Sequence, residues 1–458
     1  MALAAFPGAP ASLPHRETAG PLCRDVEPFR VLSVTVTAGV EQAVTVMAGD
    51  NPRQSCLRAL QQWESSRAFA DDVLHRTLDG SQLTTVNRAF VTEAFYGVIR
   101  NRSMLDFVIE RFRPSKLDSR TRLALQLGLY QIYKMRVAPH AAVYETVNLA
   151  GPARSLVNAV LRKAINEKEA VLSDVQSAPA YIRWSHPEFL YSRWSEEHGS
   201  GAAEELCQWN NEPAKIYVRT NQLRSTKEAL LENADGAKPS SLHTDCLEVD
   251  HLPANWIASG VVYVQDPSTL LACEILNPRP GEKVLDACAA PGGKTGYLAQ
   301  LMANSGSVLA CDYEPSRLAR LRENLARLGV SNTTVMKVDW LQDSPSLPDT
   351  NFDAVLLDVP CTNTGVIRRR TDVRWRLTPD DFRRMPKLQI RIFEKVVPYL
   401  RSGGRLVYST CSVEPEENVQ VVRLIGESIP YLRLISTKSI MPTRDGMDGA
   451  FVALFSKD

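Results

Sequence analysis

VLDACAAPGGKT, residues 284–295, is the stretch that decides the fold of this chain. Its apolar start ends in an acid, Asp286, in the way that a buried strand of an α/β sheet ends. Gly292 and Gly293 then let the backbone approach a ligand closely, and Lys294 opens a helix whose free N–H groups can hold an anion. The order of strand, glycine turn and helix indicates a nucleotide-type cofactor site.

The spacing of the glycines excludes two common nucleotide-binding loops. A Walker A loop needs a glycine five residues before Gly293, where this chain has Cys288. The dinucleotide pattern G-x-G-x-x-G needs a glycine at Pro291. A glycine turn without a ligand is the remaining alternative, and the coincidence of strand, acid, double glycine and cationic helix start argues against it.

The composition is that of an ordinary globular protein, with 44% hydrophobic and 23% charged residues. At 458 residues the chain is too long for one domain, so about two to four are expected. The net charge is +1, so any surface for nucleic acid must be local. The chain has no uncharged apolar run of membrane-spanning length and no secretion signal, so we expect a cytoplasmic protein without a membrane partner. We also expect a monomer.

The nine cysteines include no C-x-x-C pair, which disfavours both a zinc site and a disulfide framework. They lie at positions 23, 56, 207, 246, 273, 288, 311, 361 and 411. We therefore predict no metal site and a reducing compartment.

The first half of the chain divides into three regions. Residues 1–52 are rich in Ala, Pro, Gly and Thr, which predicts a disordered extension. Residues 53–170 carry apolar residues at helical spacing, which predicts a helical domain, and residues 53–169 hold 18 Lys and Arg against 11 Asp and Glu. This surplus suits RNA, although an ordinary solvated surface would also explain it. Residues 171–265 read as a connector, whose aromatic residues suit packing between domains, and a small α+β module.

Residues 266–458 alternate strands and helices, as a doubly wound sheet requires. The predicted strands are Lys283–Asp286, Ser307–Asp312, Thr334–Lys337, Ala354–Asp358, Arg405–Ser409 and Ala450–Phe455. The clearest helix is Glu314–Leu328, which Gly329 terminates. The fold class is therefore α/β, a Rossmann-like domain preceded by an all-α domain and the small α+β module.

Ligands of such a sheet bind at the carboxyl ends of its strands. Asp312 ends the second predicted strand, Asp339 follows the third and Asp358 ends the fourth. Asp312 is placed to accept hydrogen bonds from ribose hydroxyls, and Asp339 suits the amino edge of adenine. Each acid could instead cap a helix or a turn.

Cys361 and Cys411 follow the fourth and fifth predicted strands, so both belong at the same ligand-binding edge. Cysteines are common in cores, and at Cys288 only a small side chain is needed. Two thiols at the edge where catalytic groups collect nevertheless indicate thiol chemistry.

Three segments of this domain resemble the Sun (RsmB-like) family of RNA cytosine-5 methyltransferases. They are DACAAPGGKT (286–295), LLDVPCTNTGVIRR (356–369) and GGRLVYSTCSVEPEEN (403–418). YETVNLA (144–150) and SLVNAVLRKAI (155–165) are similar, more loosely, to the NusB-like RNA-binding domain that these enzymes carry at their N-terminus. The resemblance implies S-adenosylmethionine as the cofactor and ribosomal RNA, most simply that of the small subunit (16S), as the substrate.

The resemblance also implies residue roles by position. Cys411 is the nucleophile, Cys361 helps to release the product, and Asp358 recognises the base. The implied cofactor-binding residues are Cys288, Ala289, Ala290, Pro291, Gly292, Gly293, Lys294, Asp312, Asp339 and Asp358.

Two further segments are expected to face the RNA because of the same resemblance. Arg219-Thr220-Asn221 fits the signature of the family's small RNA-facing module. The loop 365–375 would lie beside the substrate with its arginines, although a solvated loop is the alternative. These arginines are Arg368, Arg369, Arg370 and Arg374.

The chemistry explains why a thiol is wanted. C5 of cytosine is a poor nucleophile, and a thiolate that adds at C6 turns the ring into an enamine whose C5 can take a methyl group. N3 must gain a proton or a strong hydrogen bond during the attack, for which Asp358 is the candidate if burial keeps it protonated. C5 must finally lose its proton so that the thiol can leave.

Two rival functions remain. A DNA cytosine methyltransferase resembles this chain only through a Pro-Cys nucleophile, whereas this chain has a second cysteine after the fifth strand. An RNA-binding assembly factor with a relic cofactor fold would not be expected to keep the whole set of Lys294, Asp312, Asp358, Cys361 and Cys411.

Overall fold

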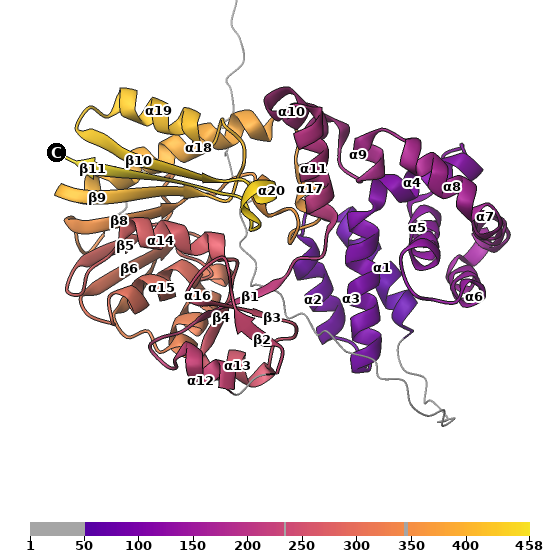
Figure 1. Ribbon diagram of the computed structural model, residues 1–458, viewed down its shortest axis with the longest axis horizontal. Coiled ribbons are helices and arrows are strands. Elements are labelled where there is room, and N and C mark those ends of the chain that lie inside the picture. Colours follow the sequence, from indigo (N-terminus) through magenta and orange to yellow (C-terminus); the bar gives the residue numbers. More distant parts are fainter. Residues whose placement is uncertain (1–50, 233–234, 343–346) are drawn as a thin grey trace, which may run out of the picture.

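A computed structural model describes residues 51–232, 235–342 and 347–458. A helical domain lies on one side of the molecule and a seven-stranded sheet with its helices on the other, with a small second sheet beside it (Figure 1). The extension predicted for residues 1–52 falls almost wholly outside the described ranges. Its last residues belong to the fold, because Asn51 caps a helix that begins at Pro52.

The helical domain is built around one central helix, α5, whose residues are buried on nearly every side. Its helices are α1 (Pro52–Ser65), α2 (Ala70–Asp79), α3 (Thr85–Arg100), α4 (Arg102–Phe112), α5 (Ser119–Tyr133), α6 (Pro139–Leu149), α7 (Arg154–Asn166) and α8 (Lys168–Ser177). Gly97 of α3 permits the close packing of α3 on α5, since a Cβ there would lie 1.9 Å from the Tyr130 ring.

Three helices connect this bundle to the rest of the chain: α9 (Ala180–Arg183), α10 (Glu188–His198) and α11 (Ser200–Asn211). Trp194 of α10 is fully buried in a cluster that contains Phe69 from the bundle and Phe382 from the sheet domain. The aromatic residues of this connector therefore pack between domains, as the sequence predicts.

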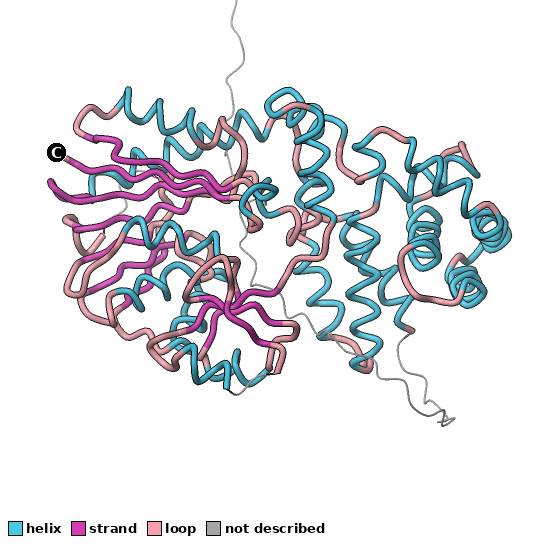
Figure 2. Tube along the Cα trace, in the orientation of Figure 1, coloured by secondary structure: helices cyan, strands magenta, loops and turns pink. Residues whose placement is uncertain are grey.

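The small module is a four-stranded antiparallel sheet in the order β2-β3-β1-β4. Its elements are β1 (Ile216–Thr220), α12 (Lys227–Glu232), β2 (Ala237–Pro239), β3 (Cys246–Val249), α13 (Ala254–Ser259) and β4 (Val262–Val264). Figure 2 shows this sheet lying between the large sheet and the helical domain.

The large sheet has the order β10-β11-β9-β8-β5-β6-β7. Its strands are β5 (Lys283–Asp286), β6 (Ser307–Asp312), β7 (Thr333–Lys337), β8 (Phe352–Asp358), β9 (Leu400–Thr410), β10 (Leu432–Ile440) and β11 (Ala450–Lys457). Strands β5 to β9 are parallel and carry the predicted ligand-binding edge, whereas β11 and β10 are antiparallel. All six predicted strands are present, and the sequence analysis missed only β10 among the described strands of this sheet.

Helices cover both faces of the large sheet (Figure 1). They are α14 (Leu271–Leu276), α15 (Gly293–Leu301), α16 (Pro315–Leu328), α18 (Asp381–Val396) and α19 (Val419–Ser428). Two short helices, α17 (Val373–Arg376) and α20 (Pro442–Asp445), lie in the connections that follow β8 and β10. Alternate strand residues serve the two cores: Leu357 packs in the cluster that contains α18 and α19 residues, and Leu356 in the one that contains α14 and α15 residues. No helix in the described ranges combines the length and apolarity needed to cross a lipid bilayer.

Candidate active site

The predicted cofactor loop joins β5 to α15 at the carboxyl edge of the sheet. Gly292 adopts φ +106°, in the left-handed region that glycine tolerates best. A Cβ on Gly293 would lie 2.8 Å from the ring of Tyr263 in β4, so the small module packs directly against the loop. The two glycines are therefore needed for a turn and for a close contact.

Two polar groups beside this loop are left without partners. The Asp286 carboxylate is buried, and its Oδ2 accepts a hydrogen bond of 2.7 Å from the Thr295 hydroxyl. Its Oδ1, and Nε2 of the buried Gln265, have no hydrogen-bond partner in the described part of the chain. Burial raises the pKa of Asp286 to about 7. An unpaired acceptor and an unpaired donor beside a glycine loop fit the polar groups of a nucleotide-type cofactor.

The other two acids of the predicted cofactor site are engaged locally. Asp312 is buried, lies 3.2 Å from the Arg317 guanidinium, and accepts a hydrogen bond from the Ala290 N–H. Asp339 accepts hydrogen bonds from the Leu341 N–H at 3.0 Å and the Gln342 side chain at 3.1 Å. Asp312 therefore braces the cofactor loop, and the bonds of Asp339 are those of a turn residue.

Lys294 and Asp358 form an ion pair, with Nζ 2.7 Å from Oδ2. Both residues line the chamber described below, so the acid predicted to hydrogen-bond the base lies beside the lysine of the cofactor loop.

The two predicted catalytic cysteines meet at the end of β8 and β9, with their sulfur atoms 3.2 Å apart. Cys361 is buried, whereas Cys411 is partly exposed and lines a cavity. Hydrogen bonding to Cys411, together with burial, raises the pKa of Cys361 well above its usual value. The Cys411 thiol donates to Oδ1 of Asn363 at 3.1 Å, so this asparagine, which no motif argument singled out, positions the exposed thiol.

The sequence analysis also missed Glu417, a buried carboxylate behind the two cysteines. It accepts hydrogen bonds from the Thr362 N–H at 2.9 Å, the Ser412 hydroxyl at 2.8 Å and the Gln389 amide at 2.8 Å. Thr362 follows one cysteine and Ser412 follows the other. Glu417 therefore ties together the two loops that carry the thiols.

A first prediction follows from the burial of Glu417, which raises its pKa from 4.5 to about 7. Since the folded protein holds this proton more tightly than the unfolded chain, the contribution of Glu417 to stability is fully present below pH ~4.5 and is lost as the pH rises through about 7. Glutamine cannot titrate. The unfolding free energy of Glu417→Gln minus that of the wild type should therefore increase between about pH 5 and 8, by an amount on the order of 1–3 kcal/mol. Denaturant unfolding of both proteins across this range tests it, and a pH-independent difference would contradict it.

The arginines of loop 365–375 do not act as one substrate-facing cluster. Arg369 is held between Asp266 and Asp448, at 2.7 Å from each. Arg374 is fully buried and donates to the Ser185 and Asn210 carbonyls at the connector. These two are structural, because buried guanidinium groups need nearby acceptors, and only Arg368 and Arg370 keep the predicted possibility of a substrate contact.

The same segment also fastens the helical domain to the sheet domain. Arg376 donates to the carbonyls of Trp63, Ser66 and Ala68 at 2.7–2.8 Å, and the Trp375 indole donates to the Ile99 carbonyl at 2.8 Å. Loop 365–375 is thus a joint between domains.

Arg219, Thr220 and Asn221, the signature of the small module, are all buried. Arg219 donates to the Gly293 carbonyl at 2.9 Å, and Asn221 donates to the carbonyls of Gly260 and Leu328. The signature therefore docks the small module onto the cofactor loop and onto the end of α16.

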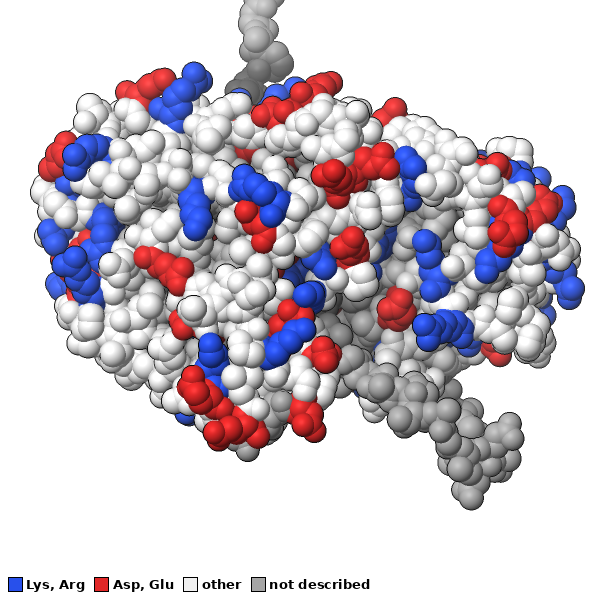
Figure 3. All heavy atoms as spheres, in the orientation of Figure 1, with Lys and Arg blue, Asp and Glu red and all other residues white. Residues whose placement is uncertain are grey.

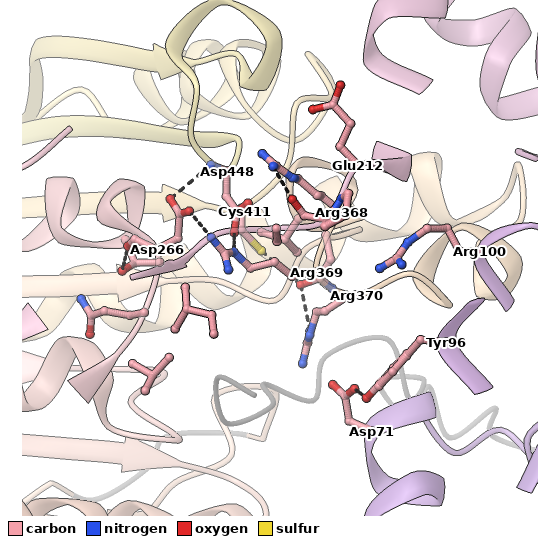
Figure 4. A pocket seen from close by; sticks show the side chains of 18 of the residues that line it. Asp71, Tyr96, Arg100, Glu212, Asp266, Arg368, Arg369, Arg370, Cys411 and Asp448 are labelled. Atoms are coloured by element: carbon pink, nitrogen blue, oxygen red, sulfur yellow. Dashed lines mark hydrogen bonds and ion pairs between the residues drawn. The ribbon is translucent and has the colours of Figure 1, made fainter. Parts of the chain in front are cut away.

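A cavity of about 750 Å³ unites these parts. Its walls include Asp358 and Cys411 from the sheet domain, together with Asp286 and the cofactor-loop residues Cys288, Ala289, Ala290, Pro291, Gly293 and Lys294. They also include Gln265 from the small module and Arg100 from the helical domain. Figure 4 shows Cys411 behind the arginine loop, with Arg100 and Tyr96 approaching from the opposite side. The predicted nucleophile and the predicted cofactor loop thus share one chamber, to which all three parts of the chain contribute.

Each of the three parts of the chain matches a known protein family. Residues 273–456 match the family described as 16S rRNA methyltransferase RsmB/F. Residues 50–166 match the NusB family, and residues 186–251 match the ferredoxin-like domain of RsmF/B-like methyltransferases.

Individual relatives cover nearly the full chain. The probable ribosomal RNA small subunit methyltransferase B of Bacillus subtilis (strain 168) is 32% identical over 441 residues, which cover 88% of this chain and 98% of that protein. The ribosomal RNA small subunit methyltransferase B of Proteus mirabilis (strain HI4320) is 34% identical over 390 residues, covering 81% and 90%. The crystal structure of PH0851 has the same fold, with a TM-score of 0.74 at 23% identity, covering 90% of this chain and 100% of that one.

These matches confirm the predicted fold class and the predicted cofactor, S-adenosylmethionine. They also confirm the family resemblance on which the residue roles depend, and the roles themselves remain predictions. The relatives share at least 30% of their residues with this chain and are covered almost end to end. The chain therefore belongs to the RsmB/F family of small-subunit ribosomal RNA methyltransferases.

Proposed function

We propose that the protein methylates C5 of a cytosine in 16S ribosomal RNA through a covalent bond between Cys411 and C6 of the base. The observation that carries the proposal is the pair of thiols 3.2 Å apart, one of which opens into the chamber that also contains the cofactor loop. A single cysteine would suffice for the initial attack, so a second thiol at this distance supports a two-thiol mechanism.

The residues of the cofactor loop, from Cys288 to Lys294, would hold S-adenosylmethionine against the small module. When bound, this cofactor supplies the methyl group as an electrophile. Asp286 and Gln265 offer it an acceptor and a donor that have no other partner in the described part of the chain.

The side chains of the protein then carry out the attack on C6 and the proton transfers at N3 and C5. The Cys411 sulfur forms a bond to C6 while N3 receives a hydrogen bond or proton from the Lys294–Asp358 pair. Cys411 reacts as the thiolate. C5 takes the methyl group as the sulfonium–methyl bond breaks, with the electron pair of that bond staying on the cofactor sulfur. The Cys361 sulfur then accepts the C5 proton, the C6–sulfur bond breaks so that Cys411 leaves as the thiolate, and N3 returns any proton it received, which restores the aromatic ring. The target base has to leave its stack to reach Cys411.

The decisive experiment is transfer of a radiolabelled methyl group to small-subunit RNA that lacks the modification, with the product nucleoside identified by mass. Label in 5-methylcytidine supports the proposal. Label in another nucleoside, or label in DNA but not in RNA, would overturn it.

A second prediction concerns Asp312, the acid beside the cofactor loop. If Asp312 accepts the ribose hydroxyls, Asp312→Ala should weaken S-adenosylmethionine binding by about 1.5–3 kcal/mol, because a hydrogen bond to a charged group is lost. Asp380→Ala is the matched control, since its exposed carboxylate pairs with the nearby Arg383 and is not a predicted cofactor contact. Calorimetry measures both affinities. Unchanged binding by a folded Asp312→Ala protein would restrict this acid to its contacts with Arg317 and Ala290.

We further propose that the domains follow the predicted order, 53–170, 171–265 and 266–458, with two shifts: α1 begins one residue earlier, and α8 extends the helical domain to Ser177. A monomeric, cytoplasmic enzyme is part of the same proposal. Sedimentation at micromolar concentration tests the monomer.

A further inference from the structure

The helical domain contributes one wall of the catalytic chamber, and this wall carries a cation that the fold does not use. Arg100 is the last residue of α3, and its side chain points into the chamber (Figure 4). Its Nε is buried and has no hydrogen-bond partner in the described ranges. The Nε atoms of Arg374 and Arg376, which hold the domains together, also lack a partner in the described ranges, so it is the place of Arg100 in the chamber that sets it apart.

Two arginines of the sheet domain line the same chamber. Arg370 donates to Oδ1 of Asn363 at 3.3 Å, and this oxygen also accepts the hydrogen bond of the Cys411 thiol. Arg368 stacks on the Trp209 ring at 4.0 Å and donates to the Pro213 carbonyl. Arg370 is therefore connected to the predicted nucleophile Cys411 through one shared residue, Asn363. Arg368 is held in a fixed orientation by its stacking and its hydrogen bond.

The positive charges of Arg100 and Arg368, which line the same chamber, repel each other. Burial lowers the pKa of Arg100, and the nearby charge of Arg368 lowers it further, whereas Tyr130 and Glu93 act in the opposite direction. An anion between the two arginines would remove both the repulsion and part of the cost of desolvation.

The two acidic groups that the helical domain contributes to the chamber are hydrogen-bonded, and Glu212 of the connector, which also lines the chamber, offsets part of the positive charge of Arg368. Asp71 accepts the hydroxyl of Tyr96, and Glu93 accepts the hydroxyl of Tyr130 at 2.6 Å. Burial and the neighbouring Asp372 raise the pKa of Asp71 to about 7, which reduces its negative charge near neutral pH. The wall can therefore accept an anion in spite of its carboxylates.

Acidic and basic side chains are interspersed on the face seen in Figure 3, so this face does not show one large basic patch to which RNA would bind. The net charge of +1 likewise gives no general attraction for a polyanion. A local arrangement such as this wall is one source of attraction for RNA, beside the surplus of Lys and Arg over residues 53–169.

We propose that Arg100, together with Arg368 and Arg370, binds a backbone phosphate of the RNA next to the target nucleotide, so that the helical domain orients the base over Cys411. This inference rests on the proposed function and extends it. A phosphate fits because guanidinium groups bind its oxygens in a bidentate manner, and because one phosphate beside a flipped base fixes the register of the strand.

Direct binding measurements on Arg100→Gln test the proposal. The probe is a synthetic RNA that spans the cytosine methylated by the wild-type enzyme. At about 0.15 M salt, the dissociation constant should rise roughly tenfold, and the slope of log K against log salt should fall by about 0.7, the value for one single-strand phosphate. Cofactor affinity should stay unchanged. Arg100→Lys should keep part of the RNA affinity that Arg100→Gln loses, because lysine carries the positive charge but cannot bind a phosphate in the bidentate manner of a guanidinium group.

Arg162→Gln is the matched control, because this arginine of the same domain is exposed and bonds only locally, to Asn158 at 3.0 Å. It should leave both the affinity and the salt slope as in the wild type. An equal loss of RNA affinity in Arg100→Gln and Arg162→Gln would show that any positive charge of the domain contributes alike, and would overturn the proposed site. An unchanged RNA affinity of Arg100→Gln would also overturn it.

A second experiment identifies the phosphate itself. Single linkages near the target are replaced by neutral methylphosphonates on a 2′-deoxy sugar, with the same sugar and an ordinary phosphate as the reference. One linkage beside the target should weaken wild-type binding about tenfold and leave Arg100→Gln unaffected. Identical responses of both proteins at every linkage would overturn the proposal. Failure of the wild type to form 5-methylcytidine would instead defeat the proposed function, and mass analysis records that separately.

Discussion

Replacement of Cys411 by alanine should abolish methyl transfer and leave no covalent complex with RNA. Cys411 is the thiol that opens into the chamber, and without its bond to C6 the C5 atom stays too weak a nucleophile. We expect the rate to fall by a factor of at least about a thousand. RNA affinity should change little, because Arg100, Arg368 and Arg370 remain in place.

The measurement combines methyl transfer with denaturing electrophoresis of protein mixed with substrate RNA and cofactor. Cys273→Ala is the matched control, because this thiol is fully buried and lies outside the chamber wall. Appreciable methyl transfer by Cys411→Ala would contradict the assignment of the nucleophile.

Replacement of Cys361 by alanine should have the opposite effect on the covalent complex. Cys361 acts after the methyl group has reached C5, so the variant should attack, methylate and then stall with the RNA attached. A slow-migrating, nuclease-sensitive band should accumulate for Cys361→Ala and disappear in the Cys361→Ala/Cys411→Ala double variant. This variant should also complete less than about one turnover in the time that the wild type completes many.

The alternative outcomes distinguish the rival mechanisms. Accumulation of the band in Cys411→Ala would reverse the two roles and resemble the DNA enzymes, which attack with the Pro-Cys thiol. Loss of activity in both variants without any trapped RNA would remove support for a covalent intermediate.

Local patterns in the sequence predicted the strands that form the ligand-binding edge. Strands β5, β6, β8 and β9 contain apolar runs, and a parallel sheet buries both faces of such runs. Strand β7, at the edge of the sheet, is only partly buried. Strand β10 was missed because residues 433–439 are exposed and polar in composition, so the only signal for this edge strand is its pairing with β11.

The sequence predicted that Cys361, Cys411 and Lys294 lie at one edge of the sheet, because each follows a strand in a local motif. Contacts between residues far apart in the chain were not predictable. Glu417 meets Thr362 across 55 positions, and Arg100 reaches the chamber from another domain. The hydrogen bond of Arg219 was not predictable either, because its acceptor, the Gly293 carbonyl, lies 74 positions away.

The joint formed by Trp375 and Arg376 has a consequence for the kinetics of RNA binding. Since these side chains hold the backbone of Trp63, Ser66, Ala68 and Ile99, the two walls of the chamber cannot swing apart as independent bodies. A preformed cleft loses little conformational entropy when it is filled, so the deformation needed for binding falls on the nucleic acid. Association should therefore be fastest with strands that already expose the cytosine, and each base pair that has to open first should slow it.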